Sequence, residues 1–238
     1  SALSPADLQL PALRAIDAGD DAPGLPAEQG PDPSFGPHDQ PAANDRLFDR
    51  MARSLSTERP TQFLATRYQG LDAIGHFYLR FATPGEFGDV TSEERQRFGP
   101  ALERHYAIID AAIGRAMGTL GRDDLLLVVS GFGMEPMSTP RRMLERLFGN
   151  PELSGTHDAA PDGFLAAYGS MVARGRPAAR ASVLDVTPTV LYFLGLPVGR
   201  DMDGYALTDL FQAGFTIDRP ITLIPTYDRS ASSTANRP

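Results

Sequence analysis

The sequence contains no cysteine and no lysine. Without cysteine, the chain can form no disulfide, no thiolate nucleophile and no cysteine-ligated zinc site. All 22 of its basic residues are arginine, and its 30 acidic residues give a formal net charge of -8. Non-specific binding of nucleic acid needs clustered positive charge that neutralises phosphates, so we expect no nucleic-acid polymer as a partner.

Long apolar runs are also missing. No stretch approaches the roughly 20 apolar residues that a membrane-spanning helix needs, so no membrane span is expected. The first residues, SALSPADLQLPALRAIDAGDDAPG, lack the basic start and apolar core of a signal peptide. That observation bears on secretion only if residue 1 is the true N-terminus.

The composition divides the 238 residues into three parts. Residues 1–44 are rich in Pro, Gly, Asp and Ala, which predicts an irregular segment. Residues 45–227 have the apolar periodicity of one folded domain. Residues 228–238 are polar and are expected to form a disordered tail.

Within the folded part, apolar patterns of helical and strand type follow one another. The pattern predicts helices from Asn44 over NDRLFDRMARSL, over 92–120 with Ser92 as cap and a break at Gly99-Pro100, over RRMLERLFG, and after Asp185 up to Gly195. It predicts strands at 61–68, at 123–131 (buried on both faces), at 163–169 and at 221–227. Alternating strands and helices predict an α/β fold with a mostly parallel sheet covered by helices on both faces.

Four histidines are the main candidates for chemistry. His38 lies in the Pro/Gly-rich stretch and is interpreted as a solvated loop residue, and His105 as a packed or surface residue of a helix. His76 follows Asp72 by four residues, a spacing that lets a carboxylate and an imidazole bind one cation. The pair follows the predicted strand 61–68, so we expect it at a carboxyl edge of the sheet, where such folds bind ligands.

His157 lies in the loop SGTHDAAPDG, just before another predicted strand. In a parallel sheet this loop could approach Asp72 and His76. Each feature alone is weak, because an Asp and a His four residues apart are common by chance. A metal-free α/β domain in which the three side chains never meet is therefore one open interpretation.

Five segments, in order, give the chain a family resemblance. They are GLDAIGH (70–76), YAIIDAAIG (106–114), LLLVVSGFGM (125–134), GTHDAAPDGFLAAYG (155–169) and DVTPTVLYFLGLPVGRDMDGYAL (185–207). Over roughly residues 60–211 the series resembles the type I phosphodiesterase/nucleotide pyrophosphatase family of the alkaline phosphatase superfamily. The resemblance implies an alkaline-phosphatase-like domain whose N-terminal part is not present in this chain.

The resemblance also implies chemistry. Members use two metal ions, usually zinc, beside a Ser or Thr nucleophile to hydrolyse phosphate esters. Asp72, His76 and His157 match the three ligands of one ion, so the chain would bind one divalent metal, zinc, and a small phosphate-ester substrate. Where the family has the Asp-His ligands of the second ion, this chain has Gly131 and Phe132, which cannot coordinate a cation. Family members are often exported, which implies a periplasmic or extracellular location.

These departures leave two functions open. The chain is either a one-metal phosphohydrolase that takes its nucleophile from residues outside the chain, or a catalytically inactive pseudoenzyme that serves as a binding or assembly module. Phe132 either fills the volume of the lost ligand against the sheet or lines a substrate pocket. Asp158 and Asp162 either orient the His157 imidazole or shape the turn.

Overall fold

A computed structural model describes residues 39–175 and 180–228. Within these ranges the fold is mixed α/β, with helices and small sheets, as the sequence predicts. Two compact units form. Among the described residues, unit 1 consists of the residues up to Arg115 together with Gly133–Pro161. Unit 2 consists of Ala116–Phe132 together with the residues from Asp162 onward. Most of the predicted irregular segment and of the predicted tail lies outside the described residues.

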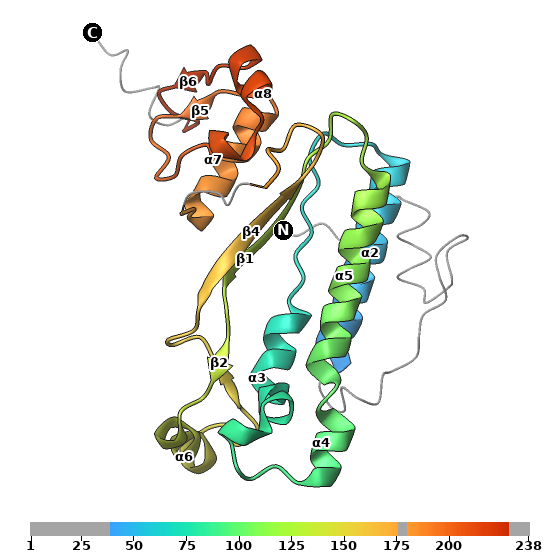
Figure 1. Ribbon diagram of the computed structural model, residues 1–238, viewed down its shortest axis with the longest axis vertical. Helices are drawn as coiled ribbons and strands as arrows, with labels where there is room; N and C mark the ends of the chain where they lie inside the picture. Colours follow the sequence, from blue (N-terminus) through green and yellow to red (C-terminus); the bar gives the residue numbers. More distant parts are fainter. Residues whose placement is uncertain (1–38, 176–179, 229–238) are drawn as a thin grey trace. The chain divides into compact units, whose positions relative to one another are not determined.

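Four helices lie in the first segment of unit 1 (Figure 1). They are α2 (Asp39–Glu58), α3 (Gly70–Ala82), α4 (Ser92–Phe98) and α5 (Ala101–Thr119), the last of which continues into unit 2. Ile74 and Tyr78, one turn apart on α3, are buried against Ala42 of α2 and Ala101 of α5. This spacing places both side chains on the same face of α3, which fixes the helix against its neighbours.

The helices predicted over NDRLFDRMARSL and over 92–120 are confirmed as α2, α4 and α5, with shifts at the ends, whereas α3 was not predicted. α2 begins at Asp39 rather than Asn44. The break at Gly99-Pro100 separates α4 from α5, as expected. The cap of α4 is Thr91 rather than Ser92, because the Thr91 hydroxyl accepts from the Glu94 amide while the Glu94 carboxylate accepts from the Thr91 amide.

The strand predicted at 61–68 is wrong. These residues have no regular structure and lead directly into α3. Phe63 is 57% exposed and Leu64 is 50% exposed. A short apolar run fits a strand and an apolar connection equally well, and here no neighbouring strand within the described residues pairs with it.

The second segment of unit 1 returns to α3. It consists of β2 (Glu135–Pro136), α6 (Thr139–Phe148) and β3 (Gly155–Thr156). β2 and β3 pair antiparallel, with Glu135 opposite Thr156. The helix predicted over RRMLERLFG is therefore confirmed as α6. Both short strands pack against α3, which brings residues far apart in the sequence together.

Unit 2 contains a two-stranded antiparallel ribbon. β1 (Leu126–Phe132) pairs with β4 (Asp162–Tyr168), with Val128 opposite Ala166. Both strands are predicted correctly, but β1 is not buried on both faces: Val129 is 43% exposed. The described residues pair in three two-stranded sheets, of which only β5 (Val198–Gly199) with β6 (Leu223–Ile224) is parallel. The larger parallel sheet stays a prediction.

The C-terminal part of unit 2 packs around aromatic rings. After the 3₁₀ turn Val183–Asp185 comes α7 (Val186–Phe193). Its cap Leu194 is followed by Gly195, whose φ of 71° suits glycine. α8 (Ala213–Asp218) supplies Phe215, which stacks on Phe193 and Phe211. Asp185 shapes the start of this part because its carboxylate accepts from the amides of Ser182 and Tyr205.

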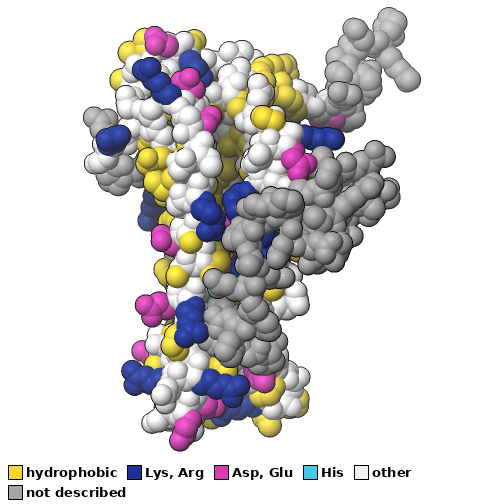
Figure 2. Space-filling model, turned by 90° about the vertical axis from the view of Figure 1, so that its right-hand side faces the viewer, with side chains coloured by type: hydrophobic (Ala, Val, Ile, Leu, Met, Phe, Trp, Pro, Cys, Tyr) yellow, Lys and Arg dark blue, Asp and Glu magenta, His cyan; other side chains and the backbone are white. Residues whose placement is uncertain are grey.

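The surface shows no gathering of one charge on the face in Figure 2, where Arg and acidic side chains are interspersed. Among the described residues, none of the helices has the length and apolar character that crossing a bilayer requires.

Candidate metal centre

Two of the three predicted ligands lie on α3 rather than at a strand end. Asp72 is in the first turn of the helix and His76 follows one turn later. Residues four apart on a helix project from the same face, so the carboxylate and the imidazole point the same way. The four-residue spacing brings the two side chains together as predicted. Their predicted position at the end of a strand was wrong, because the preceding segment forms no strand.

The third ligand arrives on the extended segment that contains β3. The amide and the hydroxyl of Ser154 both donate to the His76 carbonyl, and Ser154 Oγ also accepts from the Arg80 amide. From this anchor the chain runs along α3 toward its start. His157, three residues on, therefore reaches Asp72.

The three side chains converge. One ligand atom from each of Asp72, His76 and His157 lies within 4.8 Å of the other two. Asp72 Oδ1 is 2.8 Å from His157 Nε2 and 3.7 Å from His76 Nε2. The two imidazole rings meet edge to face at a centroid distance of 4.9 Å. A group with the composition of a metal site is thus assembled from two distant parts of the chain.

Backbone carbonyls fix which ring nitrogens face this group. His76 Nδ1 lies 2.8 Å from the Gly155 carbonyl oxygen, and His157 Nδ1 lies 2.6 Å from that of Gly133. A carbonyl oxygen only accepts, so each Nδ1 must carry the proton that it donates. In the neutral rings this leaves the Nε2 lone pairs for the centre. The same arrangement orients metal-bound histidines in proteins generally.

These donors fit a zinc-type cation. Zinc binds imidazole nitrogen and carboxylate oxygen at about 2.0–2.2 Å, which places tetrahedral ligand atoms about 3.3 Å apart. The two measured separations from Asp72 Oδ1 lie on either side of that value. The Asp72 side chain is 49% exposed and the two imidazoles 28–29%, so a fourth position would be open to solvent or substrate.

Comparisons with protein-family models, with curated proteins and with solved structures find no match. The family resemblance therefore stays a prediction.

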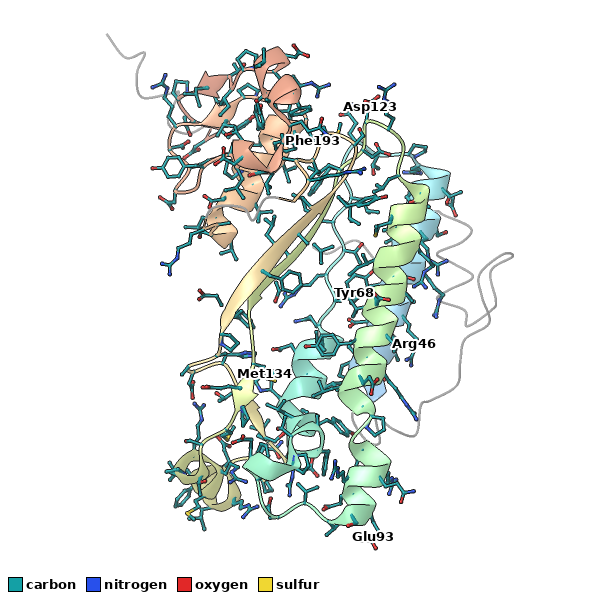
Figure 3. The ribbon with its side chains drawn as sticks, viewed as in Figure 1. Arg46, Tyr68, Glu93, Asp123, Met134 and Phe193 are labelled. Atoms are coloured by element: carbon teal, nitrogen blue, oxygen red, sulfur yellow. The ribbon has the colours of Figure 1, made fainter. Side chains whose placement is uncertain are left out.

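Glycines permit the close approach that builds the centre. A Cβ on Gly155 would lie 2.6 Å from the Gly75 carbonyl oxygen and 2.6 Å from the Met134 sulfur. A Cβ on Gly75 would lie 2.4 Å from the same sulfur. Met134 lies between β2 and α3 (Figure 3). Helix and strand therefore touch through two glycines and one thioether, which brings the Gly155 carbonyl within reach of His76.

The start of α3 rests on a buried pair that the sequence did not reveal. The Asp45 carboxylate, from α2, accepts from the amides of Gln69 and Gly70 at 2.8 Å each. His105 Nε2, from α5, lies 3.1 Å from Asp45 Oδ2, and both side chains are essentially fully buried. Asp45 thus caps α3 in place of a local residue. His105 is confirmed as a packed residue, but no local pattern indicated its partner.

A second carboxylate of α2 forms another link in unit 1. Asp49 accepts from the Arg115 guanidinium at 2.8 Å and from the Tyr68 hydroxyl at 3.3 Å. Burial, followed by the charge and hydrogen bond of Asp49, raises the pKa of Tyr68 to about 12. The segment before α3 is thereby tied to α2 by a tyrosine that stays protonated to high pH.

The remaining candidate residues have roles other than orienting His157. Its Nδ1 is taken by Gly133, so neither Asp158 nor Asp162 orients the ring. Asp158 instead pairs with Arg141, and Asp162 is the exposed first residue of β4. Phe132 is 59% exposed, so most of its ring fills no buried volume. His38 lies outside the described residues.

Proposed function

We propose that this chain is part of a metal-dependent phosphohydrolase of the phosphodiesterase/nucleotide pyrophosphatase type, with one divalent metal, zinc, held by Asp72, His76 and His157. The convergence of these three side chains, with both Nδ1 atoms anchored by carbonyls, carries the proposal. Carbonyl anchoring selects the Nδ1–H tautomer, which leaves each Nε2 lone pair available to a metal.

The chemistry follows from the donor set. A bound divalent metal would supply Lewis acidity that polarises a phosphoryl oxygen. Asp72 contributes negative charge, and the imidazoles of His76 and His157 contribute neutral nitrogen donors. The exposed side of the group leaves room for a phosphate mono- or diester. The attacking nucleophile would come from residues outside this chain, within an alkaline-phosphatase-like parallel sheet, in a protein exported to the periplasm or beyond.

A second candidate is a pseudoenzyme that keeps the scaffold as a binding or assembly module. Gly131 and Phe132, at the end of β1, favour it because neither side chain can hold a second ion. The two candidates differ in whether phosphate esters bind through the metal. A pseudoenzyme of this kind would bind its partner without a metal-dependent phosphate site.

Titration calorimetry with a non-hydrolysable phosphonate ester separates the two. We expect a binding step in the zinc-loaded chain that disappears after chelation and in His157→Ala. Asp158→Asn, which removes a neighbouring carboxylate but no ligand, should keep that step. Absence of the binding step in zinc-loaded protein would contradict the phosphohydrolase proposal and favour the pseudoenzyme.

Turnover provides a separate check. Because the nucleophile is placed outside this chain, the chain alone with zinc should hydrolyse a chromogenic phosphodiester no faster than a metal blank. Robust turnover abolished by His157→Ala would show instead that the chain carries complete catalytic machinery.

A further inference from the structure

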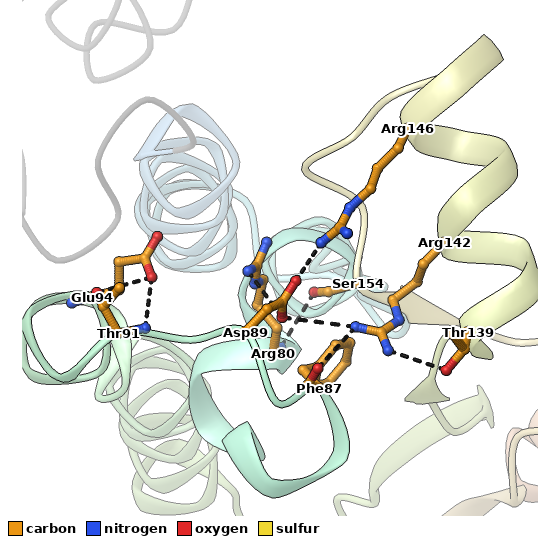
Figure 4. Close-up of polar contacts among 9 residues, drawn as sticks. All are labelled: Arg80, Phe87, Asp89, Thr91, Glu94, Thr139, Arg142, Arg146 and Ser154. Carbon is orange, nitrogen blue, oxygen red and sulfur yellow. Dashed lines mark hydrogen bonds and ion pairs between the residues drawn. The ribbon is translucent and has the colours of Figure 1, made fainter.

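Three arginines surround one carboxylate in unit 1, away from the metal ligands (Figure 4). Asp89 lies between α3 and α4; Arg80 comes from α3, and Arg142 and Arg146 come from α6. Arg146 Nη2 donates to Asp89 Oδ2. Arg80 Nη2 and Arg142 Nη1 lie 3.3 Å and 3.8 Å from Asp89 Oδ1. The cluster connects α6 to α3 one helical turn beyond His76.

The single carboxylate does not satisfy these donors. Charge-assisted N–H···O bonds are about 2.7–2.9 Å long, so two of the three contacts are loose. Arg142 donates further to the Thr139 hydroxyl at 3.2 Å and, over a longer 3.5 Å, to the Phe87 carbonyl. The Nε atoms of Arg80 and Arg142 are enclosed and have no hydrogen-bond partner among the described residues. Each guanidinium carries five N–H groups, so donors outnumber acceptors.

The charges beside the cluster point the same way. Glu94 interacts with Arg80 through its charge, but its hydrogen bonds go to Thr91. Burial by itself would raise the pKa of Asp89, but the Arg146 hydrogen bond and the three arginine charges lower it below its ordinary value. Asp89 is therefore ionised at neutral pH. Three guanidinium groups then lie beside the one Asp89 carboxylate, in a chain whose formal net charge is -8.

We propose that the arginine cluster formed by Arg80, Arg142 and Arg146 binds a phosphate dianion, either inorganic phosphate or the terminal group of a phosphate monoester. A tetrahedral oxyanion supplies several acceptor oxygens, and arginine forks match its geometry. Asp89 is 35% exposed and Arg146 51%, so an anion can enter from their side. Asp89 then competes with the ligand for the same guanidinium groups.

Calorimetry with inorganic phosphate on chelator-treated, full-length protein tests this site apart from the metal centre. The informative variants are Arg146→Gln and Asp89→Asn, which act in opposite directions. Arg115→Gln is the matched control for the first, since Arg115 is 44% exposed and pairs with Asp49 elsewhere in unit 1. Asp158→Asn is the control for the second, since it is exposed and paired with Arg141.

We expect Arg146→Gln to weaken phosphate binding about tenfold, the effect of losing one hydrogen bond to a charged group. Asp89→Asn should tighten it several-fold, and both controls should match the wild type. Glycerol 3-phosphate with similar affinity would indicate a phosphate monoester as the ligand, and binding of inorganic phosphate alone would indicate the free ion. No saturable binding, or weaker binding in Asp89→Asn, would show that the cluster only clamps α6 and would overturn the proposal.

Discussion

Replacing Gly155 with alanine should damage the candidate metal centre without changing Asp72, His76 or His157. The added Cβ would lie 2.6 Å from the Gly75 carbonyl oxygen, whereas ordinary contacts begin at 3.4 Å. This neighbour is helix backbone and cannot rotate away. The strand must therefore move from α3 by about 0.8 Å, the difference between those distances. The His76 Nδ1 to Gly155 oxygen distance of 2.8 Å would then exceed hydrogen-bonding range.

Two effects follow from that displacement. Overpacking a tight contact costs about 1–3 kcal/mol of folding stability. Losing the carbonyl that orients a metal-bound histidine lowers metal affinity about 10- to 100-fold. Zinc affinity by competition with a chromogenic chelator, beside a thermal melt, measures both quantities on the same preparation.

Gly75→Ala is the companion variant, because its Cβ would meet only the flexible Met134 side chain. Met134→Ala should therefore restore zinc affinity to Gly75→Ala and should not restore it to Gly155→Ala. If Gly155→Ala binds zinc as tightly as the wild type, the close approach does not position His76 and the reasoning fails. Equal rescue of both variants would likewise contradict the backbone contact.

Three further outcomes are expected. Gly70→Ala places a Cβ 2.5 Å from the His105 ring and should lower the free energy of unfolding by about 1–3 kcal/mol, whereas Gly114→Ala, with open space around it, should raise it by about 0.4–1 kcal/mol in urea unfolding. In ultraviolet titration, Tyr68→Phe should remove a tyrosine ionisation near pH 12. Because the folded pKa is raised, the stabilisation from the protonated phenol is complete below pH 10 and is lost as the pH rises through about 12. Asp89→Asn should make the loss of stability on acidification less steep. The pKa of Asp89 is lowered in the folded state, so its ion pairs stabilise the fold above the ordinary carboxyl range, and this stabilisation is lost as the pH falls through the folded pKa. Thermal melts with the same pH dependence in variant and wild type would contradict the ion pairs.

Local signals predicted α2, α4, α5, α6 and α7, but not α3 or α8. The Gly99-Pro100 break and Gly195 mark helix ends through backbone geometry, which needs no knowledge of distant residues. The strand at 61–68 failed because a short apolar run does not reveal whether a partner strand exists. The burial predicted for β1 failed for the same reason, since burial depends on what covers the sheet.

The candidate metal ligands were predictable by type and order, but their setting was not. Asp72 and His76 share a helix face, a consequence of spacing that the sequence contains. Asp45 and His105, which hold the start of α3, are 60 residues apart and belong to helices with no mark of their pairing. The glycine contact between α3 and β3 could not be predicted from the sequence either, because a glycine's neighbours in space depend on the folded structure.

Metal content of the purified chain, measured by mass spectrometry, tests the central claim most directly. We predict nearly one zinc per chain, lost in His157→Ala and retained in Asp158→Asn. Wild-type protein that stays metal-free after zinc is supplied would contradict the convergence of Asp72, His76 and His157 on a metal.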